Sequence, residues 1–176
     1  WSRRIYIGKH SPKSFFAGDS ILLRKSRKGN KEAFGKLYMK YLDPIYRYIY
    51  FRVNQNREEA EDLAEIVFFK AWGHIRMYQA NGKSFRAWLY TIARNTVVDH
   101  WRRQNRSVKL SEILVDPDSD LEKGLIHENE NENLLSAINR LTDEQRQVIT
   151  LKFIEGLTNK ELVFVLKKNE DAVRAL

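Results

Sequence analysis

Residues 85–106 read FRAWLYTIARNTVVDHWRRQNR, and this stretch decides the fold class. Its large apolar residues recur at steps of three and four, as in Phe85, Trp88, Leu89 and Ile92, which is the spacing along one face of an α-helix. Arginines are interleaved with the aromatic residues along the same helix. The stretch therefore predicts a long helix that carries packing groups on one side and a row of cations beside them.

The same helical spacing continues toward the N-terminus. Apolar residues step by three and four through residues 34–53 and again through residues 63–72. Asn56 is expected to cap the second of these helices, and Gly29 with Asn30 is expected to end a lead-in helix at residues 19–28. The chain shows no clear strand pattern of period two, so residues 19–106 are predicted to form an N-terminal helical bundle in an all-α fold.

Residues 107–132 interrupt the helical pattern with acidic side chains. Eight Asp or Glu residues stand against Lys109 and Lys123 in this segment, which is a net charge of −6. Such a composition is typical of a flexible acidic linker between two domains. A solvated loop with no function of its own is an equally good interpretation of the same residues.

Residues 133–176 predict a second, smaller helical domain. Two capping boxes, beginning at Thr142 and Thr158, mark the starts of two of its helices. A short turn then leads into another helix near the end of the chain, and this order of capped helix, turn and helix is typical of a helix-turn-helix. The cations Lys167, Lys168 and Arg174 at and after the turn favour contacts with DNA phosphates.

Composition excludes several classes of function. The 176 residues contain no cysteine, so disulfides, thiolate zinc sites and a cysteine nucleophile are all excluded. The four histidines are scattered without metal-ligand spacing, and the chain has no glycine-rich phosphate loop. We therefore expect a protein that is not an enzyme and that needs no metal or cofactor.

Charge and hydropathy bear on partners and location. The net charge is +8, and residues 1–31, with nine Lys or Arg against one Asp, account for all of it. Such a basic excess indicates a polyanionic partner, although simple solubility is the alternative interpretation. No apolar run approaches the roughly 20 residues that span a bilayer, and the N-terminus lacks the apolar core of a secretory signal. We expect a cytoplasmic protein.

The side chains of residues 85–106 are suited to bind nucleic acid whose strands are being separated. Aromatic faces stack on unpaired bases, each worth about 1–3 kcal/mol, and arginines neutralise phosphates. The amide of Asn95 can read a base edge. In the alternative interpretation, Phe85, Trp88, Leu89 and Ile92 belong to the core and the arginines form a solvated face. The predicted phosphate contacts are Arg94, Arg102, Arg103 and Arg106.

Residues 56–68 read NREEAEDLAEIVF and place several acids early in a predicted helix. Carboxylates near a helix N-terminus are stabilised by the macrodipole, by about 0.3–1 kcal/mol each, and this alone explains them. The alternative is that an acidic and apolar helix face docks on a partner protein.

Together these stretches resemble a sigma-70 family protein of the extracytoplasmic-function (ECF) type, over residues 19–106 and 133–176. The start of region two is similar to residues 33–38, AFGKLY. Residues 60–63, AEDL, followed by Phe68 and by Ala71-Trp72, resemble the helix that binds the polymerase clamp. The specific run is SFRAWLYTIARN at residues 84–95, followed by Asp99 and Arg102-Arg103, which resembles the segment that melts and reads the minus-ten element. Residues 141–176 resemble region four, which reads the minus-thirty-five element.

The resemblance implies roles for individual residues and partners. The implied partners are the RNA polymerase core, promoter DNA in duplex and single-stranded form, and an anti-sigma factor. Residues 1–18 fall outside the resemblance and form a basic N-terminal extension. Implied polymerase contacts are Asp62, Leu63, Glu65 and Phe68. Implied minus-ten contacts are Trp88, Arg94, Asn95, Asp99, Arg102 and Arg103, and implied minus-thirty-five contacts are Lys167, Lys168, Asn169 and Arg174.

The chain departs from the family pattern at four positions. Glu65 and Ile66 stand where relatives usually place Gln and an acid, which affects the details of polymerase contact. Val163 and Lys167 replace the usual small residue and turn glycine of the helix-turn-helix, so Lys167 is expected to adopt a left-handed conformation. Two rival functions remain. One is a helix-turn-helix regulator that binds DNA without polymerase, and the other is a helical nucleic-acid enzyme or a basic adaptor protein.

Overall fold

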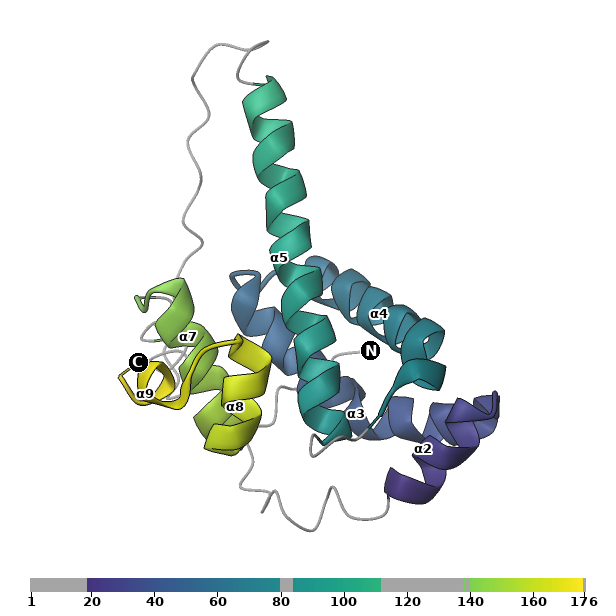
Figure 1. Cartoon of the computed structure of the whole chain (residues 1–176). Coiled ribbons are helices and arrows are strands. Elements are labelled where there is room, and N and C mark those ends of the chain that lie inside the picture. The colour runs from purple at the N-terminus through teal and green to yellow at the C-terminus, as the bar shows by residue number, and fades with distance from the viewer. Residues whose placement is uncertain (1–18, 80–83, 112–137, 139, 176) are drawn as a thin grey trace, which may run out of the picture.

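The computed structural model describes residues 19–79, 84–111, 138 and 140–175, and every regular element within these ranges is helical (Figure 1). The predicted all-α fold class is confirmed. The predicted basic extension at residues 1–18 and most of the predicted acidic linker lie outside the described residues.

The first domain consists of α2 (Asp19–Arg27), α3 (Lys31–Arg52), α4 (Arg57–His74), the 3-10 turn η1 (Ile75–Met77) and α5 (Phe85–Ser111). The predicted end of the lead-in helix near Gly29 and Asn30 and the predicted cap at Asn56 are both present. The Asn30 side chain accepts a hydrogen bond from the Ala33 amide at 2.8 Å and caps α3, and Gly29 before it has a φ of 88°. The Asn56 side chain accepts from the Glu59 amide at 3.2 Å and caps α4. These caps fix where each helix starts.

The core of this domain lies between α3, α4 and the first half of α5. Ile49, Val67 and Leu89, one from each helix, are fully buried. Tyr48 of α3 and Tyr90 of α5 meet edge to face, with ring centroids 5.5 Å apart, which is a favourable aromatic geometry. The first half of α5 is thus a core helix.

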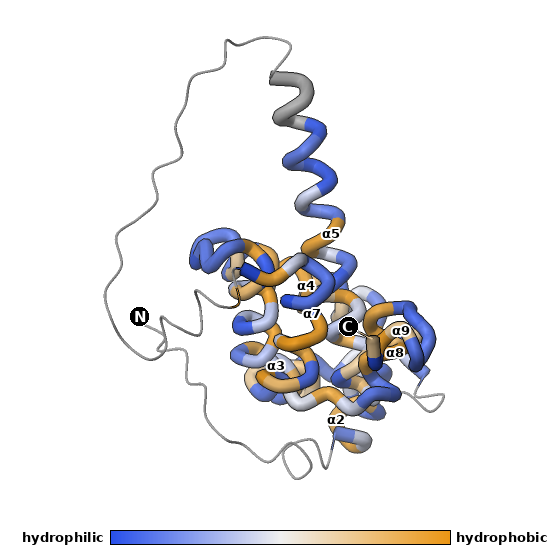
Figure 2. Tube along the Cα trace, turned by 90° about the vertical axis from the view of Figure 1, so that its left-hand side faces the viewer, coloured by the Kyte–Doolittle hydropathy of each residue, from blue (hydrophilic) through white to orange (hydrophobic). Residues whose placement is uncertain are grey.

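The second half of α5 leaves the core. The helix continues to Ser111, past the predicted start of the linker at residue 107, and in Figure 1 its upper part projects beyond the body of the protein. Figure 2 shows hydrophilic residues along this part and more apolar residues toward its base. One continuous helix therefore connects the packed interior to an exposed arm.

The second domain contains α7 (Asp143–Ile149), the π-helical turn η2 (Thr150–Ile154), α8 (Asn159–Leu166) and α9 (Glu170–Arg174). Both predicted capping boxes are present, at Thr142 and Thr158. Lys167 follows α8 with φ 56° and ψ 37°, the left-handed conformation expected for it. The predicted helix-turn-helix is therefore the pair α8 and α9.

The two domains pack against each other in this structure. Helix α8 lies against α5, and α7 and η2 lie against α3 (Figure 1). Apolar residues of the second domain, such as Leu151 and Val165, are fully buried. The sequence had given no relative placement of the domains, so this contact is a finding of the tertiary structure.

The left-handed Lys167 generates a stability prediction. A side chain at such a φ is strained by about 1 kcal/mol, and glycine relieves this strain. We expect Lys167→Gly to raise the free energy of unfolding by about 0.5–1 kcal/mol in urea denaturation followed by circular dichroism. The matched control is Lys36→Gly in the interior of α3, which should lower it by about 1 kcal/mol. A loss of stability for Lys167→Gly would contradict the strain.

Candidate nucleic-acid interface

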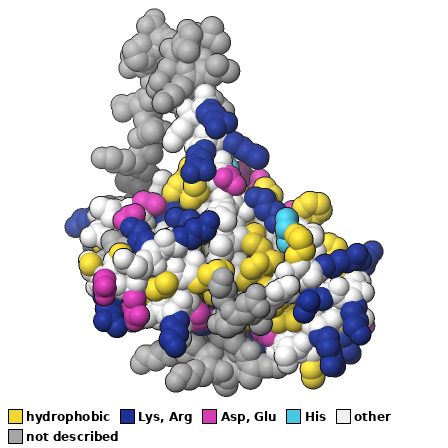
Figure 3. Space-filling model, viewed as in Figure 1, with side chains coloured by type: hydrophobic (Ala, Val, Ile, Leu, Met, Phe, Trp, Pro, Cys, Tyr) yellow, Lys and Arg dark blue, Asp and Glu magenta, His cyan; other side chains and the backbone are white. Residues whose placement is uncertain are grey.

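The projecting half of α5 presents a cluster of exposed arginines. Arg102, Arg103 and Arg106 are all exposed, and the Arg102 side chain retains 72% of its accessible surface. Arg102 pairs with Asp99 at 3.8 Å, and this pair is itself exposed. Figure 3 shows Lys and Arg side chains gathered where α5 leaves the body. These side chains can reach a phosphate backbone without any rearrangement of the core.

The first half of α5 holds Trp88 at the edge of an aromatic cluster. The Trp88 ring lies 5.1 Å from the ring of Tyr78 and 5.5 Å from that of Phe85, measured between centroids. Phe85 and Leu89 are buried, as the core interpretation predicted, whereas Trp88 and Ile92 are half-buried. Trp88 is therefore held in place by packing on one side and keeps part of its surface accessible on the other.

Arg94 and Asn95 lie between these two parts of α5 and are both half-buried. The Nε of Arg94 is buried and has no hydrogen-bond partner in the described structure. Its guanidinium is close enough to the Tyr48 hydroxyl to lower the pKa of that group, although burial has the larger effect and raises it. Arg94 is thus much less accessible than Arg102 and Arg103.

The predicted polymerase-binding face on α4 is corrected in part by the structure. Asp62 and Glu65 are exposed, but Leu63 and Phe68 each keep only 4% of their surface. Phe68 packs against Tyr38 of α3 with ring centroids 4.8 Å apart. These two apolar residues belong to the core because they lie on the side of α4 that faces α3. The exposed apolar residues beside the two acids are instead Ile66 and Phe69, at 43% and 80% exposure.

The cations of the helix-turn-helix are exposed to different degrees. Lys167 is exposed, while the Lys168 ammonium donates to Glu144 of α7 at 2.9 Å. The Asn169 side chain accepts from the Ala172 amide at 2.8 Å, so its oxygen caps α9. Arg174 pairs with Glu170 one turn earlier, at 2.9 Å. Two of the cations predicted to contact phosphates, Lys168 and Arg174, are therefore held in ion pairs at the surface.

Sequence reasoning missed a buried polar cluster between the domains. Glu155, at the end of η2, accepts two hydrogen bonds from the Arg47 guanidinium, at 2.6 and 2.9 Å, and one from the Tyr90 hydroxyl at 2.8 Å. Arg86 of α5 donates to the Glu161 carboxylate at 2.6 Å. Glu161 is part of the capping box that begins at Thr158, and no local pattern marks the other members.

The pKa values of the two carboxyl groups in this cluster, Glu155 and Glu161, are shifted in opposite directions. Burial raises the pKa of Glu155 above its ordinary value, and the hydrogen bonds from Arg47 and Tyr90 offset this only in part. Burial also acts to raise the pKa of Glu161, but there the hydrogen bonds from Arg86 and Ser84 outweigh it and the pKa lies below its ordinary value. The difference follows from burial, which is nearly complete at Glu155 and partial at Glu161.

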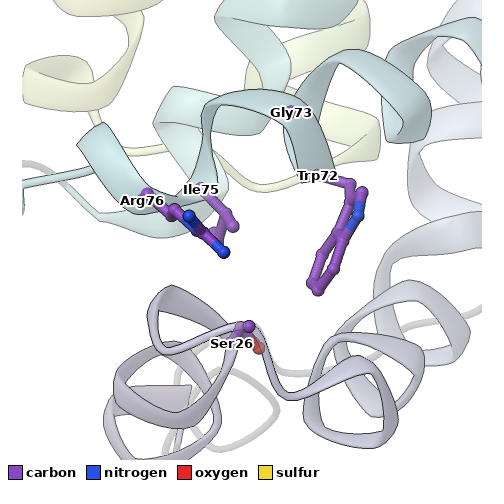
Figure 4. Close-up of a pocket in the computed structure, with 6 residues that line it drawn as sticks. Ser26, Trp72, Gly73, Ile75 and Arg76 are labelled. Atoms are coloured by element: carbon purple, nitrogen blue, oxygen red, sulfur yellow. The ribbon is translucent and has the colours of Figure 1, made fainter.

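A small open pocket lies away from all of these surfaces. It has a volume of about 260 Å³ and opens between α2 and the end of α4, with Ser26 on one side and Trp72 and Arg76 on the other (Figure 4). None of the predicted DNA or polymerase contacts lines it. Within the described ranges no three His, Cys, Asp or Glu side chains are grouped to hold a metal, and none of the helices is long and apolar enough to cross a membrane.

Comparison with known proteins identifies the family. The model of Sigma-70 region 2 matches residues 37–107, and that of Sigma-70 region 4 matches residues 131–176. The chain is 30% identical over 156 residues to the ECF RNA polymerase sigma factor SigW of Bacillus subtilis, which covers 82% of each protein. The chain belongs to the sigma-70 family, in its ECF group. The family is not enzymatic, so the prediction of a non-enzymatic protein is confirmed.

Other relatives agree with this assignment. The ECF sigma factor BldN of Streptomyces coelicolor is 38% identical over 159 residues, which is 88% of this chain but 60% of BldN, so the chain spans less than two thirds of that relative. Among solved structures, CnrH in complex with the cytosolic domain of CnrY superimposes with a TM-score of 0.65 at 25% identity, covering 89% of this chain and 88% of CnrH. The predicted presence of sigma regions two and four in this chain is confirmed.

The burial of Leu63 in α4 can be tested by measuring the stability of variants. Leu63→Ala removes a buried side chain and should lower the free energy of unfolding by about 2–4 kcal/mol. Asp62→Ala, at the neighbouring exposed position, should change it by less than about 0.5 kcal/mol. Urea denaturation of the two variants measures both values, and near-equal stabilities would show that Leu63 is not a core residue.

Proposed function

We propose that the chain directs RNA polymerase to promoters and stabilises opened promoter DNA, while the polymerase core performs the chemistry. The observation that carries this proposal is that the two halves of α5 differ in exposure. The half that projects from the body carries exposed arginines, and the half in the core holds the half-buried indole of Trp88. A surface with cations and a fixed aromatic ring binds separated strands better than closed duplex, because only separated strands offer bases for stacking.

The minus-ten surface is assigned to α5. Arg102 and Arg103 bind phosphates, and the amide of Asn95 and the ring of Trp88 contact bases. Asp99 restrains Arg102 through an exposed pair, which is worth under about 1 kcal/mol and gives way to a phosphate. This surface therefore needs little energy to exchange its internal contacts for DNA.

The polymerase-binding surface is assigned to the exposed face of α4. Asp62 and Glu65 supply negative charge, and the adjacent exposed Ile66 and Phe69 supply apolar area. This combination of a charged rim and apolar anchors is the usual composition of a protein-binding surface. Asp62 and Glu65 keep the role predicted for them, and Ile66 and Phe69 take the places of the buried Leu63 and Phe68.

The minus-thirty-five surface is assigned to Lys167, Lys168, Asn169 and Arg174. Lys168 and Arg174 are held by exposed ion pairs with Glu144 and Glu170. Such pairs contribute little energy, so both cations can turn to phosphates. The donors on the Asn169 amide nitrogen remain available while its oxygen caps α9.

The proposed function also suggests how the chain is regulated and where in the cell it acts. CnrH was solved in complex with the cytosolic domain of CnrY, and this likeness supports the proposal that an anti-sigma protein binds this chain as well. We place the chain in the cytoplasm, where promoter DNA and polymerase meet. A helix-turn-helix regulator that acts without polymerase is the alternative function, and the capped α8–α9 pair is the observation that favours it.

Run-off transcription tests the proposed function. Purified polymerase core with a cognate promoter should yield a transcript that depends on this chain. Asp62→Ala should lower the affinity for core at least several-fold while the helical content stays that of the wild type, because the position is exposed. A chain that binds promoter duplex but neither binds core nor supports a transcript would instead be the regulator of the alternative function.

The salt dependence of promoter binding tests the role of α5. Each phosphate contact to a single strand contributes about 0.7 to the slope of log affinity against log salt, so Arg102→Ala with Arg103→Ala should reduce the slope of the holoenzyme by about 1.4. The matched control, Lys31→Ala with Lys36→Ala on α3, removes the same charge from a surface outside α5. An unchanged slope in the arginine variant would refute the assigned phosphate contacts.

A further inference from the structure

We propose that the open pocket between α2 and the end of α4 binds a nucleotide, with the base against the Trp72 ring and the phosphate on the Arg76 guanidinium. In Figure 4 both side chains extend toward Ser26 on the opposite wall. The residues that line the pocket are Ser26, Gly29, Trp72, Gly73, Ile75 and Arg76. None of them belongs to the surfaces assigned to promoter elements or polymerase, so this inference goes beyond the proposed function.

The Trp72 indole offers an aromatic face that is already ordered. The residue is half-buried, and its ring packs against Phe34 of α3 with ring centroids 5.0 Å apart. The same ring also lines the pocket. Stacking of a base on an aromatic ring is favourable and tolerant of base identity. Because packing has already fixed the ring, stacking here costs little additional side-chain entropy.

The Arg76 guanidinium supplies the group for a phosphate. Arg76 is exposed in η1 and makes no ion pair within the described ranges. A Cβ placed on Gly29 would lie 3.6 Å from Nη2 of Arg76, so the guanidinium reaches across to the turn after α2. Arginine binds phosphate through paired, charge-assisted hydrogen bonds. Arg76 can therefore bind a phosphate without giving up an ion pair of its own.

The opposite wall of the pocket is held rigidly. Asp19 at the start of α2 is buried and accepts hydrogen bonds from the Lys40 ammonium, at 2.5 Å, and from the Tyr41 hydroxyl. Ser26 is fully buried, and its hydroxyl donates to the Leu22 carbonyl at 2.7 Å. Helix α2 also packs on both α3 and η1. The two walls are thus in place before a ligand binds, which lowers the cost of binding.

The surroundings of the pocket are strongly basic. Within residues 24–31, at the end of α2 and the start of α3, five cations are exposed, namely Arg24, Lys25, Arg27, Lys28 and Lys31. Two neighbouring acids are already bound, since Asp19 contacts Lys40 and Glu32 pairs with Lys36 at 2.9 Å. Figure 3 shows Lys and Arg side chains gathered at the lower right, where Figure 1 places α2. This excess of positive charge favours an anionic ligand.

The volume of the pocket limits the size of the group that enters it. Sites for drug-sized ligands have volumes of about 300–1,000 Å³. This pocket has a volume of about 260 Å³ and is open on one side. It therefore holds one ring system such as a base and leaves the phosphate at the rim, beside Arg76 and the cations of α2. A ligand with no charge would leave these cations unused.

A nucleotide can come from two sources that offer the same base and phosphate. One source is a free nucleotide, and the other is the separated strand of DNA. Tyr78 connects the second source with the pocket, because it follows η1 and its ring lies 5.1 Å from that of Trp88. Burial and the charge of Asp19 raise the pKa of Tyr78, and Arg27 of α2 is close enough to act against them. A strand stacked on Trp88 thus has aromatic and basic groups leading to the pocket.

Tryptophan fluorescence of the full chain tests the pocket, because a stacked base quenches an indole. The probes are adenosine 5′-monophosphate and a short single-stranded oligodeoxyadenylate. The oligonucleotide is titrated in a Trp88→Phe background, so that stacking on the proposed minus-ten surface does not contribute. We expect at least one probe to quench the fluorescence. Adding Trp72→Phe, which keeps an aromatic ring beside Phe34, should abolish that part of the quenching that arises in the pocket.

Arg76→Ala tests the phosphate contact. We expect it to weaken the binding of the quenching probe about tenfold, because charge-assisted hydrogen bonds to the phosphate are lost. Adenosine, which has no phosphate, should bind this variant and the wild type equally. The matched control is Arg57→Ala, which removes the same charge from the exposed start of α4 and should leave binding unchanged. Both positions are exposed, so the circular dichroism of both variants should be that of the wild type.

The outcomes identify the source or overturn the inference. Quenching by adenosine 5′-monophosphate assigns the pocket to free nucleotides, and quenching by the oligonucleotide alone assigns it to the separated strand. No quenching of Trp72 by either probe, or equal binding by Arg76→Ala and the wild type, overturns the nucleotide site. The chain is titrated without polymerase, so either result leaves the outcome of run-off transcription, and with it the proposed function, to be decided separately.

Discussion

The packing of the first half of α5 is the constraint on which the rest of the structure depends. This half lies against α3, α4 and α8 at once, with Leu89 and Val97 fully buried. Because a helix is stiff over its length, fixing the first half also fixes the direction of the projecting half. The positions of the exposed arginines, of Trp88 and of the helix-turn-helix domain all follow from this one packed segment.

Helix α5 takes part in two kinds of contact, and different parts of its surface make each kind. The side with Arg86 and Tyr90 faces the helix-turn-helix domain, while Arg102 and Arg103 lie beyond the reach of that packing and remain exposed. One element therefore carries both the proposed nucleic-acid surface and the surface on which the helix-turn-helix domain packs.

The sequence predicted well where the helices lie, but it predicted less well which helix faces are buried. The caps at Asn56, Thr142 and Thr158 could be read directly, because a side chain bonds to an amide three residues on and the signal is local. Asn30 was expected only to end the preceding helix, and its cap on α3 is a finding of the structure. Leu63 and Phe68 were assigned to a partner by the family resemblance, which does not say what covers each side of the helix in this chain. Only the position of α3 shows that this face is internal.

The sequence by itself determined the all-α fold, the starts of most helices, the left-handed Lys167 and the family resemblance, because each depends on residues close together in the chain or on a specific run. Only the tertiary structure decided which apolar residues are buried and which charges meet across the domains. Arg47 and Glu155 are 108 residues apart, and no local spacing relates them. Their pairing depends on how two separately folded domains pack, and this is set by the combined shape and polarity of both surfaces.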